Sequence, residues 1–401
     1  LRQNRMARPT RDVPHTYVPA ALCMRVGPAS RWTARDGEFP TSLSSQRWGP
    51  MHLSDLLLLA IPVGLWAEFV AHNPLIAFVA SAVAVLRLAA WMGHATEQVA
   101  IHAGPRIGGF LNGTLGNAAE LIIVVLAVRQ GLFDVVKAPI TGAILGNALL
   151  VLGLAITLGG LRHREQRFNQ NLASFNTTLL FIAATALVVP AVFHSGAHAI
   201  SNAGLAMLSL LASFVLIAAY GASLLFSFKT HAHLFVTAGG HSEEAEWSKD
   251  KAIGILIGAT VGVVLMSETL VGSIEPVLSA LGWSELFVGV VVVALVGNAA
   301  EHSTAIMMAM QNRMDAAVEI AVGSTTQIAM LVAPITVFVS WLAGTPMSLE
   351  FIGAELVSIL ISVLLVNQVA RDGETNWLEG LVLLGAYLIM AAAFYIVDPE
   401  N

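Results

Sequence analysis

The chain has 401 residues, of which 56% are hydrophobic and 11% charged, with a formal net charge of −6 and a mean hydropathy of +0.74. Soluble globular proteins carry about 25% charged residues, so this composition excludes a soluble domain and predicts an integral membrane protein. The single cysteine, Cys23, excludes a disulfide framework and a cysteine-based metal site.

Residues 1–50 differ from the rest of the chain, because they hold eight of the 20 Lys and Arg residues and no apolar run long enough to span a bilayer. They show no signal-peptide pattern. We expect a basic, poorly ordered N-terminal extension with no role in the chemistry of the membrane part. A functional cytoplasmic tail is the alternative.

Apolar segments follow that are long enough to cross a bilayer as helices, for which about 20 residues suffice. We expect eleven of them, near residues 53–72, 74–102, 107–129, 137–160, 172–193, 203–228, 251–273, 285–310, 315–341, 349–368 and 377–397. The predicted fold is therefore an all-α polytopic membrane protein. Glycine and proline are expected to interrupt the helices at 142–153 and 323–334, as transporters tolerate where backbone lines a cavity.

The positive charges of the loops predict the orientation. If the first helix runs outwards from the cytoplasm, nine loop Lys and Arg residues lie on the cytoplasmic side and two, Arg129 and Lys137, on the outer side. This bias follows the positive-inside rule. We expect a cytoplasmic N-terminus, an outer C-terminus and a cytoplasmic linker at 229–250 that is acidic and contains His231, His233 and His241. The linker is interpreted as a solvated connection, with a cation-sensing surface as the alternative.

One short motif occurs twice inside apolar spans. Gly116 to Glu120 reads GNAAE, and the same five letters return from Gly297 to Glu301, so that Glu301 lies 181 positions after Glu120. A carboxylate in the middle of a membrane span costs about 2.5–3.5 kcal/mol on insertion scales. Two such carboxylates in duplicated sequence predict one site built from two halves.

The same offset of 181 residues aligns Asp134 with Asp315 and Gly142 with Gly323, so helices two to six match helices seven to eleven. Five helices per repeat is an odd number, and the second copy therefore inserts upside down. This is the inverted-repeat plan of secondary transporters, whose substrate sites lie near the bilayer midplane.

The predicted organisation is a first transmembrane helix at 51–73, a first repeat at 74–228 and a second repeat at 251–397. At 1.5 Å per residue, Glu120 lies about 20 Å into its span and Glu301 about 24 Å into its own, from opposite faces. The two carboxylates can therefore meet near mid-membrane.

The residues of the motif suit a hard cation. Asn117 and Glu120 share one face of a helix, as do Asn298 and Glu301. Two carboxylates and two amide oxygens match the preference of Ca²⁺ for 6–8 oxygen ligands, and the sequence has no Cys or His cluster for a softer metal. The alternative is that these side chains only bond neighbouring helices. Supporting polar groups are expected on the fourth and ninth helices, and the candidates are Asn147, Ser324, Thr325, Thr326 and Gln327, although Ser and Thr in membrane helices often bond their own backbone.

Four further groups within the spans carry charge or can acquire it. Glu97 is expected towards the cytoplasmic end of helix two and Glu268 towards the outer end of helix seven, as relays for protons or cations; interfacial exposure is the alternative. His302 can couple transport to protons or be a bonded core histidine. Arg87 lies in the middle of a span, where we expect a carboxylate or carbonyl partner.

At GGFLNGTLGNAAELI and GNAAEHSTAIMMAMQNRMD the chain resembles the Ca²⁺/H⁺ antiporter (CAX) family of the cation/Ca²⁺ exchanger superfamily, over residues 53–397. The resemblance implies that Glu120 and Glu301 form the cation site, with Asn117, Asn298 and His302 at the corresponding motif positions. It also implies contributions from the fourth and ninth helices. Ala143 and Gly146 depart from the family pattern, which often has Ser at these positions, and this weakens the expectation of hydroxyl ligands on helix four.

The expected function is export of cytoplasmic Ca²⁺ in exchange for H⁺ by alternating access, with the two carboxylates occupied in turn by Ca²⁺ and by protons. The expected partners are these ions and the lipid bilayer of a prokaryotic inner membrane, with no cofactor and no nucleic acid, and a homo-oligomer is left open. The alternatives are a Na⁺/Ca²⁺ or other cation/proton exchanger, an intramembrane metal hydrolase and a channel. The sequence has no HExxH-type pattern for the hydrolase and no ring of acids for the channel.

Overall fold

The computed structural model describes residues 53–104, 108, 111, 113–195, 200–232 and 245–396. The chain divides into two units, Leu1–Arg47 and Trp48–Asn401, and all described residues lie in the second unit. The predicted N-terminal extension and most of the predicted linker therefore lie outside the described residues.

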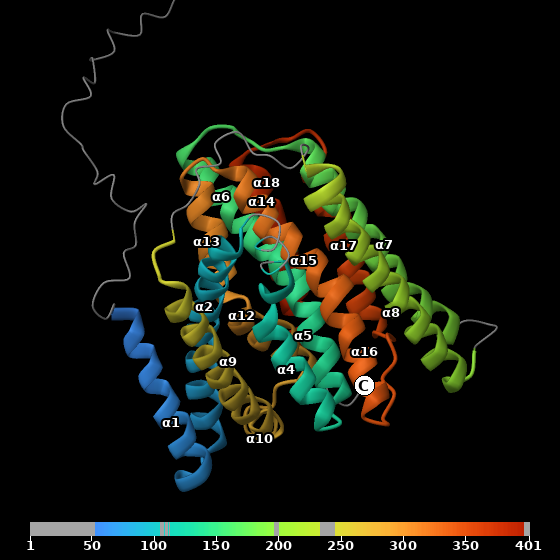
Figure 1. Cartoon of the computed structure of the whole chain (residues 1–401). Coiled ribbons are helices and arrows are strands. Elements are labelled where there is room, and N and C mark those ends of the chain that lie inside the picture. The colour runs from blue at the N-terminus through green and yellow to red at the C-terminus, as the bar shows by residue number, and fades with distance from the viewer. Residues whose placement is uncertain are drawn as a thin grey trace, which may run out of the picture. The chain divides into compact units, whose positions relative to one another are not determined.

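The first part of the chain forms helices that match the predicted spans one to six (Figure 1). The first span is η1 (Leu53–Leu59), α1 (Ala60–Trp66) and η2 (Ala67–Ala71), and the second is α2 (Pro74–Ala103). They are followed by α4 (Ala118–Arg129), and by α5 (Phe133–Leu145), η3 (Gly146–Val151) and α6 (Leu152–Arg162) in line. The next are α7 (Gln170–Ser195), α8 (Asn202–Leu225) and η4 (Phe226–Thr230).

The second part begins with α9 (Lys249–Gly272) and α10 (Ile274–Leu281). The eighth predicted span is made of α11 (Glu285–Phe287), η6 (Val288–Val293), α12 (Ala294–Gly297) and α13 (Ala299–Met310). The ninth is made of α14 (Met314–Val318), η7 (Glu319–Gly323), α15 (Ser324–Gln327), η8 (Ile328–Val332) and α16 (Ala333–Leu342). The last two helices are α17 (Gly353–Val369) and α18 (Trp377–Ile396).

The predicted all-α membrane fold is confirmed, but the predicted count of eleven spans is not. Among the described residues, eight helices are long and apolar enough to cross a membrane, and the bent pair Ile274–Leu281 and Glu285–Gly297 makes up to nine. The described helix in the third span, α4, has only 12 residues, and α17 has 17. The inverted relation of the two repeats stays a prediction.

The positions of the helix breaks differ from the prediction. The stretches 142–153 and 323–334 run on as helix, with wider π-helical turns at η3, η7 and η8. A break occurs instead in each GNAAE motif, where Gly116, Asn117 and Asn298 are in turns. The glycine and asparagine of the motif therefore end one helix and begin the next.

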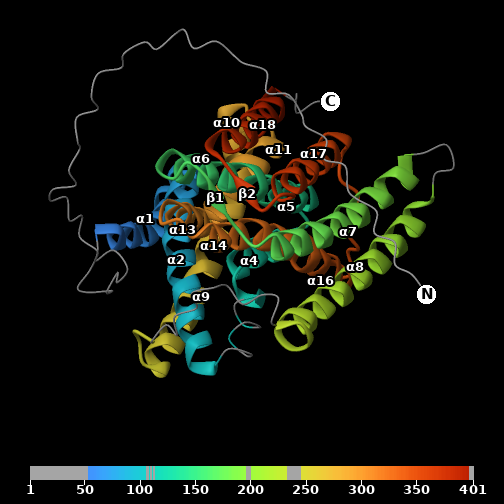
Figure 2. The ribbon, with the colours of Figure 1, turned by 90° about the horizontal axis from the view of Figure 1, so that it is seen from above.

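Several loops meet at one end of the helix bundle. Strand β1 (Gln166–Arg167) pairs antiparallel with β2 (Glu374–Thr375), which joins the loop after α6 to the loop after α17 (Figure 2). The Gln166 side chain also donates a hydrogen bond to the Ala309 carbonyl at the end of α13 (2.6 Å). The predicted topology places these three loops on the same side of the membrane.

The charge of Arg87 is paired, as predicted. Its guanidinium contacts the carboxylate of Asp55 on η1, and the Trp91 indole donates to the same carboxylate at 3.2 Å. The side chains of Arg87 and Asp55 are 9% and 10% exposed. This ion pair ties the first helix to α2, whereas much of α1 and η2 presents apolar side chains outwards (Phe69 is 69% exposed).

We expect Asp55→Ala to destabilise the protein by about 3–5 kcal/mol, because it leaves the Arg87 charge buried without its carboxylate. Thermal unfolding in detergent measures the effect. The double variant Asp55→Ala/Arg87→Met should recover most of the loss, since it removes both charges. Equal melting temperatures for the single and double variants would contradict this role of the pair.

Glycines allow the fourth and eighth spans to pack closely. A Cβ atom on Gly142 of α5 would collide with the Val290 carbonyl of η6, and one on Gly289 would collide with Ala138. The backbone of α5, which follows the first GNAAE motif, therefore packs directly against the backbone of η6, which precedes the second motif. This contact places α12 and α13 beside α5 and η3.

Candidate cation site

Each GNAAE motif forms the start of a helix inside the bundle. Asn117 is the N-cap residue of α4, and Asn298 is the N-cap residue of α13. Neither side chain caps its own helix, so both amides are available to other helices. Glu120 and Glu301 lie in the first turns of their helices, where the helix dipole stabilises a negative charge by about 0.3–1 kcal/mol.

A chain of hydrogen bonds joins the two motif asparagines. Asn147 Nδ2, on η3, donates to Asn298 Oδ1 (3.0 Å) and to Ser324 Oγ (2.9 Å). Ser324 Oγ in turn donates to Asn117 Oδ1 (2.9 Å), and Asn117 Nδ2 donates to Gln327 Oε1 (2.7 Å). The third, fourth, eighth and ninth spans therefore meet at one polar centre.

The two motif carboxylates lie at this centre. Glu301 lies near Ser324 and close enough to Glu120 for their charges to interact. The Glu120 carboxylate lies against Gly297 of the other motif, where a Cβ atom would be 3.0 Å from Glu120 Oε1. Gly297 thus leaves room for the carboxylate of the opposite half.

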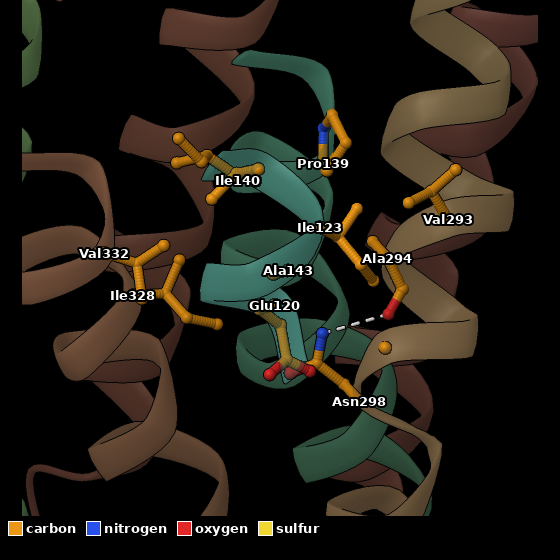
Figure 3. Close-up of a pocket in the computed structure, with 12 residues that line it drawn as sticks. Glu120, Ile123, Pro139, Ile140, Ala143, Val293, Ala294, Asn298, Ile328 and Val332 are labelled. Carbon is orange, nitrogen blue, oxygen red and sulfur yellow. Dashed lines mark hydrogen bonds between the residues drawn. The ribbon is translucent and has the colours of Figure 1, made fainter. Parts of the chain in front are cut away.

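The surroundings of Glu120 are mostly apolar. It lines a cavity of about 10 Å³ with Ile123, Ala143, Val293 and Ile328, among others, and with Asn298, which donates to the Ala294 carbonyl (Figure 3). This volume suits about one water-sized particle. Ala143 supplies no hydroxyl here, as expected from its departure from the family pattern.

Two acceptor oxygens at the centre are buried without a hydrogen-bond donor among the described residues. They are Asn147 Oδ1 and Glu301 Oε2. Buried polar atoms are almost always satisfied, and these two can only accept. Such atoms beside two carboxylates fit a ligand that offers positive charge, either a metal cation or a proton.

Some predicted site residues join this centre and others do not. Asn117, Asn298, Asn147, Ser324 and Gln327 are all in the hydrogen-bond chain. The hydroxyls of Thr325 and Thr326 bond their own helix instead, at Ala321 O (2.7 Å) and Val322 O (2.8 Å), which is the alternative stated for them.

The other titratable residues are placed apart from the chain of amides. His302 is buried, and its Nε2 atom has no described hydrogen-bond partner. Glu97 and Glu268 are exposed, on α2 and α9, so their relay roles stay predictions.

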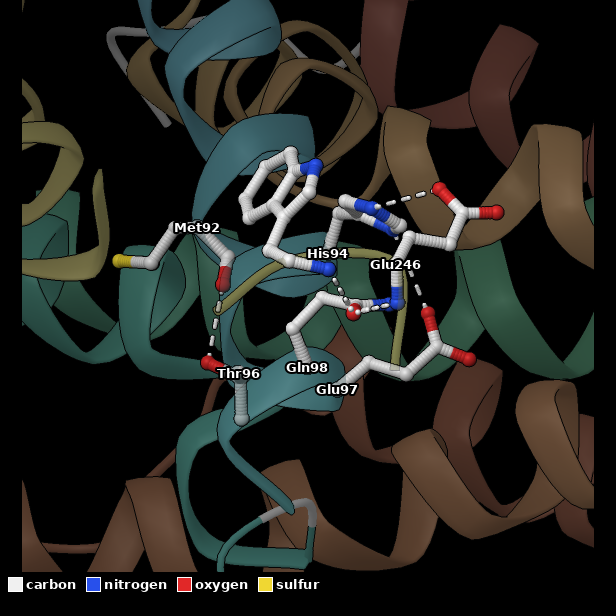
Figure 4. A network of polar contacts seen from close by, with 7 residues as sticks. Met92, His94, Thr96, Glu97, Gln98 and Glu246 are labelled. Atoms are coloured by element: carbon white, nitrogen blue, oxygen red, sulfur yellow. Dashed lines mark hydrogen bonds and ion pairs between the residues drawn. The ribbon is translucent and has the colours of Figure 1, made fainter. Parts of the chain in front are cut away.

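The end of the predicted linker packs on α2 (Figure 4). Gln98 Oε1 accepts hydrogen bonds from the backbone N–H groups of Glu246 and Trp247 (2.8 and 3.2 Å). His94 lies between the carboxylates of Glu97 (3.5 Å) and Glu246 (3.9 Å). Glu97 therefore belongs to a surface network with the linker.

Sequence reasoning missed two carboxylates that the structure brings into the helix bundle. Glu319, on η7, accepts a hydrogen bond from Asn176 Nδ2 (2.9 Å), and Glu355, on α17, accepts one from Thr141 (2.9 Å). Both lie within predicted spans. The cost of a carboxylate in an apolar span, which drew attention to Glu120, was the signal that could have found them.

Comparison with known proteins identifies the family. The model of the sodium/calcium exchanger protein family matches residues 73–229 and 251–396. The chain belongs to this family. The match covers both predicted repeats and leaves out the linker.

Relatives of this exchanger-family chain are named Ca²⁺/H⁺ antiporters. One from Aphanothece halophytica is 42% identical over 86% of this chain and 97% of the relative. ChaA from Bacillus subtilis is 44% identical over 85% of this chain and 98% of its own length. The solved structure of native YfkE is 42% identical, covers 86% of this chain and all of its own, and superposes with a TM-score of 0.76. A structure of an H⁺/Ca²⁺ exchanger, CAX, at 16% identity and a TM-score of 0.67, shares the fold. The resemblance seen in the two motifs is confirmed.

Proposed function

We propose that this exchanger-family protein exports Ca²⁺ from the cytoplasm in exchange for H⁺ by alternating access. The observation that carries the proposal is the proximity of Glu120 and Glu301 at a buried polar centre, where two acceptor oxygens have no hydrogen-bond donor among the described residues. The names of the relatives supply the two ions.

Shared use of the carboxylates accounts for the exchange. Two buried carboxylates close to each other repel unless a positive charge lies between or on them. Ca²⁺ offsets both charges at once, with Asn117, Asn298 and Asn147 supplying amide oxygens, and protons offset them one by one. A site that holds neither Ca²⁺ nor protons is energetically unfavourable, because two buried negative charges then remain unpaired. The carrier therefore changes conformation with one of the two ions bound, and this couples the two fluxes.

The arrangement of the site also indicates how access alternates. The centre lies where helices of the two predicted inverted repeats cross, and each motif is a helix break rather than a rigid helix interior. Rocking of one repeat against the other around a fixed site is the general mode of such transporters. We propose the bacterial inner membrane as the location, with a cytoplasmic N-terminus and an outer C-terminus.

A second function, Na⁺/Ca²⁺ exchange, follows from the family description. The test is uptake of radioactive calcium by proteoliposomes of the full chain under an imposed pH gradient or an imposed Na⁺ gradient, each alone. We expect the pH gradient to drive uptake and the Na⁺ gradient to have no effect. Uptake driven by Na⁺ alone would overturn proton coupling.

A further inference from the structure

Glu319 is a carboxylate inside the bundle that the exchange mechanism above does not use. It lies on η7, five residues after the start of α14 at Met314 and five residues before Ser324. At 1.5 Å per residue, it is about 7.5 Å along the helix from each. Glu319 is therefore about halfway between the end of the span and the central polar chain.

The side chain of Glu319 points towards the centre. Side chains of a helix usually lean towards its N-terminus, but Glu319 Oε1 lies only 3.4 Å from where a Cβ atom on Gly323 would be. Gly323 is four residues nearer the centre, and Gln327, which accepts from Asn117, is four residues further along the same face. The absence of a side chain at Gly323 leaves this face open between Glu319 and the polar chain.

Glu319 lies at the surface of the described residues, whereas Glu355, a carboxylate at the other end of the bundle, does not. Glu319 is exposed, although Asn176, which holds its Oε2 atom, is only 7% exposed. Glu355, in the first turn of α17, is 2% exposed and is closed off by its bonds to Thr141 and to the Ile352 backbone. The bundle thus presents an accessible carboxylate on the Met314 side and a sealed one on the opposite side.

We propose that Glu319 is a staging site for the transported divalent cation, between the Met314 side of the membrane and the central pair Glu120–Glu301. The proposal rests on the proposed Ca²⁺ exchange. A dication that leaves water needs oxygen ligands to replace its hydration shell, and the carboxylate of Glu319 supplies the first of them. Asn176 holds the carboxylate in place through one oxygen and leaves the other, Oε1, directed towards the centre.

A purely structural role predicts a different result from substitution. Glutamine at position 319 keeps an oxygen that accepts the Asn176 hydrogen bond, so Glu319→Gln is neutral if the pair only joins α7 to η7. Asn176→Ala removes that bond and keeps the carboxylate. The staging site therefore predicts the larger transport defect for Glu319→Gln, and a structural role predicts it for Asn176→Ala.

The experiment measures the Ca²⁺ dependence of transport in everted and in right-side-out membrane vesicles that contain the full chain. We expect Glu319→Gln to raise the KM for Ca²⁺ about tenfold in one vesicle orientation, which is the everted one if the Met314 side is cytoplasmic, and to leave it unchanged in the other. Asn176→Ala should change KM less than twofold, and Glu319→Asp should give an intermediate KM. Glu275→Gln, an exposed carboxylate on α10, is the matched control and should behave as wild type.

Two results would overturn the staging site. They are a wild-type KM for Glu319→Gln on both sides, and an equal increase on both sides. The wild-type vesicles separate this failure from failure of the proposed function, since absent Ca²⁺/H⁺ exchange in the wild type removes both proposals, whereas normal exchange with an unchanged KM removes only this one.

Discussion

Replacing Glu120 or Glu301 with glutamine is expected to reduce Ca²⁺/H⁺ exchange to the background of empty liposomes. Each substitution keeps the size of the side chain and removes one of two negative charges from a buried site. Removing one carboxylate takes away one partner of the buried ion pair with Ca²⁺, and such a loss costs about 2–5 kcal/mol. This corresponds to a roughly 30- to 5000-fold lower affinity for Ca²⁺. Calcium uptake under a pH gradient, normalised to folded protein, measures the loss.

Two controls make this prediction specific. Glu275→Gln removes the same charge from an exposed position on α10 and should keep wild-type uptake. Each single variant at the site should elute from size exclusion as wild type, because an amide replaces a carboxylate that repels its neighbour. Uptake at the wild-type rate by Glu120→Gln would contradict a shared site.

Gly142→Ala is expected to destabilise the protein by forcing α5 away from η6. The new methyl group would collide with the Val290 backbone carbonyl, and backbone cannot move aside as a flexible side chain can. Overpacking usually costs about 1–3 kcal/mol and sometimes more. We expect a melting temperature in detergent that is lower by several degrees and a reduced yield of monodisperse protein.

Gly146→Ala is the matched control, one turn further along the same helical span. A Cβ atom on Gly146 would meet no atom within 4 Å, so the variant should melt as wild type. Equal melting temperatures for the two alanine variants would show that α5 and η6 do not rely on this close approach.

The duplicated motif was enough to predict which helices meet at the buried polar centre, while the cation site itself stays a prediction. Its two carboxylates lie in apolar spans that were expected to enter the membrane from opposite faces, which puts both at about the same depth. Because a buried charge is costly, we expected the two carboxylates to lie close together in one site. Arg87 followed the same logic, because a mid-span cation requires a partner. The identity of that partner, Asp55, depends on how the first helix packs against α2, which the sequence pattern does not specify.

The geometry inside the site was harder to predict. Asn117 and Glu120 were expected on one continuous helical face, but the helix breaks at Asn117. The turn at this break leaves the Asn117 amide free to bond Ser324 and Gln327 on another span. Ser324 could not be separated from Thr325 by residue type, because both hydroxyls can bond their own backbone. Their different positions around the helix decide that only Ser324 faces Asn147.

The central claim is that one pair of carboxylates binds either Ca²⁺ or protons, and proton release on Ca²⁺ binding tests it most directly. Purified protein in weakly buffered detergent solution is titrated with Ca²⁺ while a pH-sensitive dye records the solution. We expect acidification that saturates with Ca²⁺ binding in the wild type and disappears in Glu120→Gln together with the binding. Saturable Ca²⁺ binding with no proton release across the range in which exchange operates would contradict it.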